Sequence, residues 1–224
     1  MERSSPVGSW SLYRDTELLV SRCFDALRPR SPTWMAELRD GLAEYGAEPE
    51  DFAQMVVGTG PGSFSGIRAA IAALQGMALP RQVPVFGLTS SAVLAGLAAR
   101  ASRAEEGTVT VVGDARRNRL WCAVYCWCGD HLTVATSGMP PTHSGAEFVL
   151  TTWEGLPAHI PPGSLLVSPD RDRLGDGLAR LPGVVLDEAA STPDAAGLAR
   201  LFFSAPNAAR RDPSPIYLHP AVAH

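Results

Sequence analysis

The chain contains no lysine, because all nineteen of its basic residues are arginine. This absence excludes phosphoryl transfer that depends on a lysine, and it excludes Schiff-base chemistry on a side chain. No apolar run approaches the ~20 residues that a membrane-spanning helix needs. The first residues lack the apolar core of a signal peptide, so we expect a cytoplasmic protein that is not bound to a membrane.

The net charge and the spacing of the cysteines argue against two further kinds of site, a strongly basic nucleic-acid surface and a thiolate metal or redox site. The net charge is −4, which does not predict a strongly basic surface for nucleic acid. Of the four cysteines, Cys122, Cys126 and Cys128 are evenly spaced and would share one face of a strand. A thiolate metal site or a redox pair would need a C-x-x-C spacing or a nearby histidine, and this segment has neither. We therefore expect buried free cysteines and no metal site.

The order of the predicted elements indicates an α/β fold, because strands and helices alternate along much of the chain. Two segments, at about residues 7–24 and 108–128, each have the pattern of two strands joined by a polar turn. This repetition suggests two similar lobes. We expect an N-terminal lobe at residues 1–104, which holds a glycine-rich turn and two helices, and a C-terminal lobe at residues 105–224.

The glycine-rich turn, Gly58-Thr59-Gly60-Pro61-Gly62-Ser63-Phe64-Ser65-Gly66-Ile67-Arg68, is the most informative stretch. An apolar strand leads into it and an Ala-rich helix leads out. Closely spaced glycines indicate positive φ or close approach by another group, and a serine at the helix start can act as its cap. The stretch is either an anion-binding loop or a tight structural connection, and its spacing fits neither standard phosphate loop. The residues of this motif are Gly58, Gly60, Pro61, Gly62, Ser63, Gly66 and Arg68.

Two predicted helices, at about residues 31–45 and 63–79, are candidates for a protein interface. The second is apolar on nearly every face over residues 67–74, which indicates two buried faces, and its small residues would let another helix approach closely. The alternative is that these residues pack only on the chain's own sheet. The candidate partner-binding residues are Trp34, Met35, Leu38, Ile67, Ala70, Ala73 and Leu74.

Residues 57–68 closely resemble the signature V-G-x-G-P-G-S-F-T-G-[LI]-R of the TsaB (YeaZ) family. Three later segments resemble the family in the same order: the strand and turn at 83–90, Asp114-Ala115-Arg116, and Pro215-Ile216-Tyr217-Leu218. The resemblance spans most of the chain. It implies the two-lobed α/β fold of the actin/hexokinase/Hsp70 (ASKHA) type, with mixed central sheets.

The resemblance also implies a function. The family supplies the dimerisation subunit for bacterial synthesis of threonylcarbamoyladenosine on tRNA. A TsaD-like catalytic subunit and a TsaE-like ATPase would be its partners, with a homodimer when it is alone and only indirect contact with tRNA. Such chains lack a working nucleotide site, so the resemblance implies no catalytic residue, no metal and no cofactor of its own.

The chain departs from the family pattern at its start. The family opens with a strand that ends in D-[TS]-[SA], whereas Arg3-Ser4-Ser5 stands here and the aspartate is missing. We therefore expect a shortened first strand.

Two other functions remain open. A hydrolase or small-molecule kinase of the same superfold would use Asp114 and one of the five histidines, none of which lies beside a recognisable nucleophile or base. Direct tRNA binding would use Arg116, Arg117 and Arg119, which could contact phosphates from one turn.

Overall fold

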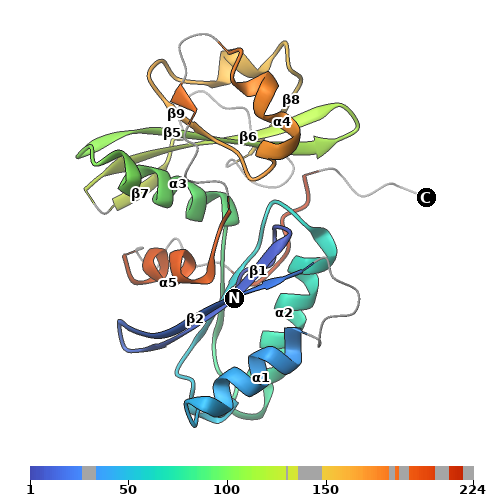
Figure 1. Ribbon diagram of the computed structural model, residues 1–224, viewed down its shortest axis with the longest axis vertical. Helices are drawn as coiled ribbons and strands as arrows, with labels where there is room; N and C mark the ends of the chain where they lie inside the picture. The colour runs from blue at the N-terminus through green and yellow to red at the C-terminus, as the bar shows by residue number, and fades with distance from the viewer. Residues whose placement is uncertain are drawn as a thin grey trace. The chain divides into compact units, whose positions relative to one another are not determined.

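The computed structural model describes residues 1–26, 34–129, 131–135, 148–181, 185–186, 192–204 and 212–218 (Figure 1). Its strands and helices alternate as the α/β prediction requires. Contacts divide the chain into two compact units, Met1–Ser90 with Pro193–Pro215, and Ser91–Thr192 with Ile216–His224.

This division differs from the expected boundary between residues 104 and 105. Helix α3 (Ser90–Ser102) belongs almost entirely to the second unit, because its Leu94, Ala95 and Ala98 are buried in that unit's core. Helix α5 (Ala195–Ser204) belongs to the first unit, where the buried Leu198 packs, although it lies far along the chain.

The first unit begins with the predicted hairpin, in which β1 (Val7–Arg14) pairs antiparallel with β2 (Glu17–Asp25). Asp15 adopts a φ of 53° in the turn, a conformation that aspartate tolerates better than most residues. Helix α1 (Trp34–Glu44) follows, and its expected start at Ser31-Pro32 lies outside the described residues. A single 3-10 turn, Pro49–Asp51, leads to the next strand.

Strands β3 (Met55–Gly58) and β4 (Val85–Leu88) form a parallel pair, joined through helix α2 (Phe64–Ala78) and the 3-10 turn Leu79–Arg81. The crossover helix is what a parallel pair requires. One core holds the unit together. It includes Trp10 of β1, Leu42 of α1, Val57 of β3 and Ile71 of α2.

The second unit is built on a sheet with the order β10-β9-β5-β6-β7, and β8 also pairs with β6. The sheet is mixed, because β9 runs parallel to β5 while β6 runs antiparallel to it. The strands are β5 (Glu106–Arg116), β6 (Arg119–Cys128), β7 (His131–Val134), β8 (Val149–Thr151), β9 (Leu165–Val167) and β10 (Val185–Leu186). The strand-turn-strand pattern at residues 108–128 predicted β5 and β6, whereas strands of two to four residues carry little periodic signal.

Helices cover both faces of this sheet. Helix α3 packs on the face that includes Trp121 and Tyr125, and helix α4 (Arg171–Leu178) packs with Leu156 of the turn Leu156–His159 on the other. Among the described helices, each is too short or too polar to span a lipid bilayer.

The three cysteines of β6 are at even-numbered positions, and they lie on the face of the sheet opposite α3. The odd-numbered residues of β6 pack toward α3, whereas Cys122 packs with residues of α4. All three are free thiols, with Cys122 buried, Cys126 half-buried and Cys128 exposed. Burial raises the pKa of the Cys122 thiol to about 12, which makes it unreactive at neutral pH. Only Cys122 therefore fits the expected role of a fully buried free cysteine.

Candidate functional site

The glycine-rich turn connects β3 to α2, as the sequence predicted. Ser63 is the N-cap of α2, and its side chain accepts a hydrogen bond of 3.3 Å from the Gly66 amide. The Ser63 amide in turn donates a 2.7 Å hydrogen bond to the carbonyl oxygen of Ser4. The start of the chain is therefore attached to the start of this helix.

The glycines of the turn make room for that first segment of the chain. A Cβ atom at Gly62 would lie 2.2 Å from the Ser4 carbonyl oxygen, and one at Gly66 would lie 2.3 Å from the Arg3 carbonyl oxygen. Gly60 has a φ of 92°, which also favours glycine. At these positions the close approach comes from the chain's own backbone.

Glu2 is the buried centre of this arrangement. The Ser4 amide donates a 2.6 Å hydrogen bond to Glu2 Oε1, and the Ser90 hydroxyl donates one of 2.8 Å to Oε2. The Ser90 oxygen also accepts a hydrogen bond of 3.1 Å from the Gly60 amide. A Cβ atom at Gly58 would lie 1.9 Å from Glu2 Oε2, so a glycine is required beside the carboxylate.

Opposing effects act on the Glu2 carboxyl group. Burial raises its pKa, while the hydrogen bonds from Ser4 and Ser90 and the positive charge of the Met1 ammonium lower it. The net direction is upward, because burial is the largest effect. Glu2 was not among the predicted site residues, although the family's aspartate is missing at this point of the sequence. The signal was the acidic residue directly before Arg3-Ser4-Ser5.

Met1 and Glu2 lie between β1 and β3. The Met1 ammonium donates a hydrogen bond of 2.7 Å to the Val56 carbonyl, and the Gly58 amide donates one of 2.9 Å to the Met1 carbonyl. Glu2 forms an isolated antiparallel bridge with Ser9.

Arg3 is buried against aromatic rings, with 8% of its surface exposed. Its guanidinium carbon lies 4.4 Å from the centre of the Trp34 ring and 5.6 Å from that of Phe24, which stacks on Trp34. Both distances allow cation–π attraction. Trp34, predicted to contact a partner, therefore contacts its own chain through a ring face.

The predicted partner-binding residues differ in how far they are buried in the structure. Leu38, Ile67, Ala70 and Leu74 are all buried in the core of the first unit. The spacing of 67, 70 and 74 marks the inward face of a helix, so these side chains cannot contact a partner on the surface of α2. Trp34 and Ala73 are half-buried, and Met35 of α1 is 43% exposed.

A different face of α2 is exposed, which we call the outer face. At its two ends are large apolar side chains, Phe64 with 50% and Leu79 with 75% of their surface exposed. Arg68 lies over the Phe64 ring, with its guanidinium carbon 5.1 Å from the ring centre. Ala72 between them is exposed, and a Cβ atom at Gly76 would meet nothing within 4 Å. Phe64 and Leu79 are not among the predicted partner-binding residues, whose spacing follows the inward apolar face of the helix.

Asp114, the candidate catalytic group of the alternative enzyme, is held in an ionic network. Its carboxylate lies 3.3 Å from the guanidinium of Arg116 and 3.1 Å from that of Arg173. The Asp114 amide donates a 2.8 Å hydrogen bond to Asp170. Of the five histidines, only His131 and His159 lie within the described residues, and no described group of three His, Cys, Asp or Glu side chains could hold a metal ion.

The turn that follows Asp114 presents the three arginines considered for tRNA. Arg116, Arg117 and Asn118 all have positive φ, between 53° and 65°. The side chain of Arg116 is 71% exposed, although it is paired with Asp114. The turn is thus an exposed tip whose first arginine already has a carboxylate partner.

Sequence and structure comparisons with known proteins agree with the resemblance of the glycine-rich motif to the TsaB (YeaZ) family. Residues 27–139, half of the chain, match the family model described as TsaD, tRNA N6-adenosine threonylcarbamoyltransferase. The chain is 29% identical over 115 residues to the tRNA threonylcarbamoyladenosine biosynthesis protein TsaB of Bacillus subtilis, covering 51% of this chain and 48% of that protein. It is 32% identical over 88 residues to the Escherichia coli protein of the same name, covering 39% and 37%. These matches span less than half the length of the relatives.

The structural similarity covers far more of the chain. A crystal structure of a Pseudomonas aeruginosa protein, described as uncharacterized and similar to peptidase YeaZ, superimposes with a TM-score of 0.74 at 23% identity. It covers 97% of both chains. The fold is therefore shared over nearly the full length.

Proposed function

The chain belongs to the TsaB/YeaZ family, and from this we propose that it is a non-catalytic dimerisation subunit supporting threonylcarbamoyl transfer to tRNA adenosine. A TsaD-like protein would be the catalytic partner, and a TsaE-like ATPase would join the complex. The two-lobed ASKHA architecture follows from the family. In this proposal the chain binds no cofactor of its own, and it contacts tRNA only indirectly.

The outer face of α2 is the observation that carries this proposal. Exposed apolar side chains at both ends, Phe64 and Leu79, are typical of a surface that is covered in a complex. The small residues between them, Ala72 and Gly76, allow a second helix to approach closely. Met35 of the neighbouring α1 adds another exposed apolar side chain.

The non-catalytic role is supported by the surroundings of Asp114. Two guanidinium groups, from Arg116 and Arg173, lie within 3.3 Å of its carboxylate. Both ion pairs occupy the Asp114 carboxylate within its own chain. We therefore assign Asp114 to the stability of the second unit.

The proposed interface can be tested by a substitution that places a charge on the outer face of α2. Ala72→Arg should weaken co-purification with the cognate TsaD-like subunit, or dimerisation in light scattering, at least tenfold, because a buried unpaired charge costs several kcal/mol. Ala101→Arg is the matched control, since Ala101 is an exposed alanine of α3. If the Ala72→Arg protein is folded by circular dichroism and still forms both complexes like the parent, the interface lies elsewhere.

A further inference from the structure

One face of the sheet in the second unit carries two free cysteines that the proposed function does not use. Cys126 and Cys128 of β6 are two positions apart, so both side chains lie on the same face of the strand. Cys126 is half-buried and Cys128 is exposed. Farther along β6, Cys122 is buried in the core formed with α4, and among the described residues that core contains neither of the other two cysteines. The pair is therefore reachable from solvent.

Strand pairing places polar side chains on both sides of the two cysteines. Cys128 lies opposite Glu106 of β5 and His131 of β7, and all three are exposed. Cys126 lies between two threonines, one in each of the same neighbouring strands. Residues directly opposite each other share a face of the sheet. The thiols therefore lie among polar groups, and a histidine that the sequence analysis did not weigh lies beside them.

The spacing of the two cysteines is too long for a disulfide bond but suits a shared metal ion. A strand rises about 3.3 Å per residue, so the two Cβ atoms are about 6.6 Å apart. A disulfide needs Cβ atoms about 4 Å apart. Two metal–sulfur bonds of about 2.3 Å in a straight line place the sulfur atoms about 4.6 Å apart. Each sulfur then has to lean toward the other by about 1 Å, which side chains on a strand can do.

The number of available ligands indicates the kind of ion. A Zn²⁺ site takes three or four protein ligands, and no described group of three His, Cys, Asp or Glu side chains could hold a metal ion. Glu106 and His131 therefore lie beside the two thiols without completing a tetrahedral set. Thiolates are soft ligands that favour Cu(I), and two of them in line satisfy this ion.

We propose that Cys126 and Cys128 bind one Cu(I) ion in a linear, two-coordinate site on this face of β6. Each thiol loses its proton as its sulfur–copper bond forms, so binding releases two protons and transfers no electron. Both ligands come from a strand that is paired on both sides, so its backbone is already fixed before the ion binds. Cys122 cannot replace either ligand, because burial raises the pKa of its thiol to about 12 and keeps it protonated.

The first test is an anaerobic titration of the reduced full chain with Cu(I) in the presence of the chromogenic chelator bicinchoninate. We expect one Cu(I) per chain to be withheld from the chelator, and Cys126→Ser or Cys128→Ser to weaken binding at least a hundredfold. Cys23→Ser is the matched control, because Cys23 is an exposed cysteine of β2 in the first unit, and it should change the affinity less than threefold. Equal loss in all three variants, or no Cu(I) withheld by the parent, overturns the proposal.

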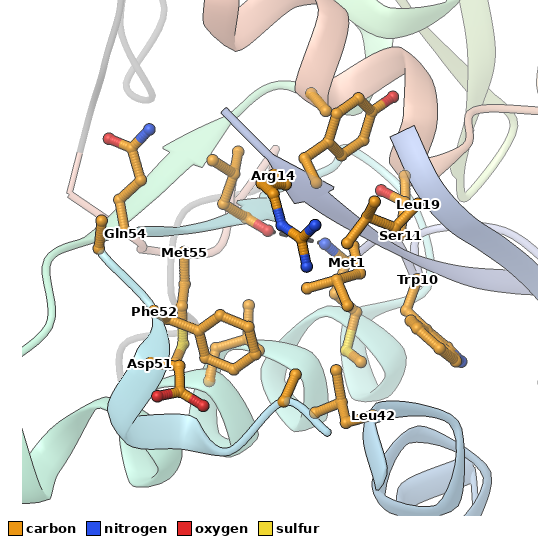
Figure 2. Close-up of a pocket in the computed structure, with 18 of the residues that line it drawn as sticks. Met1, Trp10, Ser11, Arg14, Leu19, Leu42, Asp51, Phe52, Gln54 and Met55 are labelled. Carbon is orange, nitrogen blue, oxygen red and sulfur yellow. Dashed lines mark hydrogen bonds between the residues drawn. The ribbon is translucent and has the colours of Figure 1, made fainter. Parts of the chain in front are cut away.

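The sulfur atoms of methionine must be distinguished from this pair. Met55 and Met77 line a cavity of about 570 Å³ in the first unit (Figure 2). Thioethers are also soft ligands for Cu(I), but they have no proton to release. Met55→Leu should therefore leave both the affinity and the release of two protons, measured with a pH indicator in weak buffer, unchanged. Loss of Cu(I) binding in the folded Met55→Leu protein would place the ion in the cavity and contradict the proposal.

The coordination number can be measured on the loaded chain. X-ray absorption should show two sulfur ligands and no nitrogen, and His131→Gln should change the affinity less than threefold. A nitrogen ligand that His131→Gln removes, or binding of Zn²⁺ as tight as that of Cu(I), would show that neighbouring side chains join the site and that the two-coordinate assignment is wrong. Light scattering should give the loaded chain the same mass as the metal-free chain. Half a Cu(I) per chain with a doubled mass would mean that two copies share the ion, which also overturns the proposal.

Discussion

The Ser90 hydroxyl donates a hydrogen bond of 2.8 Å to the carboxylate of Glu2, although the two residues are 88 positions apart. Both side chains are buried. This bond joins the start of the chain to the segment that follows β4, and the glycine-rich turn lies between them. The stability of the first unit should therefore depend on a residue that no local pattern marks as structural.

Glu2→Ala should lower the free energy of unfolding by about 1–3 kcal/mol, because it leaves the buried Ser4 amide and the Ser90 hydroxyl without their acceptor. Urea unfolding followed by circular dichroism would measure the change. Glu105→Ala, at an exposed glutamate, is the control and should change stability by less than about 0.5 kcal/mol. Equal effects of the two substitutions would contradict the role of Glu2.

Gly62→Ala should destabilise the first unit by about 1–3 kcal/mol, because the new methyl group would lie 2.2 Å from the Ser4 backbone oxygen. Gly76→Ala is the matched control. A Cβ atom there meets nothing within 4 Å, and alanine favours a helix over glycine by up to ~1 kcal/mol. We expect the melting temperatures of these two variants to move in opposite directions, and a fall in both would argue against the steric explanation.

The buried Met1 ammonium should make stability depend on pH. Burial lowers its pKa from 8.0 to about 6, so between these values the unfolded chain binds more protons than the folded one. Stability due to this group is full above pH 8 and is lost as pH falls through 6, by up to about 3 kcal/mol.

Acetylation of the Met1 amine isolates this effect, since the acetylated chain cannot titrate there. Urea unfolding at pH 5.5, 7 and 8.5 should show a slope in the parent that the acetylated protein lacks. The raised pKa of Glu2 acts in the opposite direction, because its folded carboxyl group keeps a proton to higher pH and loses stability as pH rises above 4.5. The same slope in both proteins would show that Met1 is not responsible.

The purified chain should not turn over ATP by itself, because Asp114 is paired with two arginines and the sequence has no lysine for the phosphates. A coupled assay with the homogeneous protein would measure this. The control is Asp114→Ala, which should give the same background rate. Sustained turnover in the parent that Asp114→Ala abolishes would favour the enzyme alternative.

Local patterns in the sequence predicted the hairpin of β1 and β2, the capped helix α2 and the alternation typical of an α/β fold. These features depend on residues a few positions apart. Ser63, for example, caps α2 through an amide only three residues away. The glycine-rich motif could also be recognised from the sequence, because its four glycines lie within nine consecutive residues.

Only the tertiary structure decided what those elements face. The sequence showed that α2 is apolar on most sides, but packing against β3 selected Ile67, Ala70 and Leu74 as core and left Phe64 and Leu79 exposed. Likewise, the hydrogen bond between Glu2 and Ser90 depends on a contact between segments that are 88 positions apart in the sequence. Helical periodicity and capping are short-range, whereas burial and strand pairing are settled only when the whole unit packs.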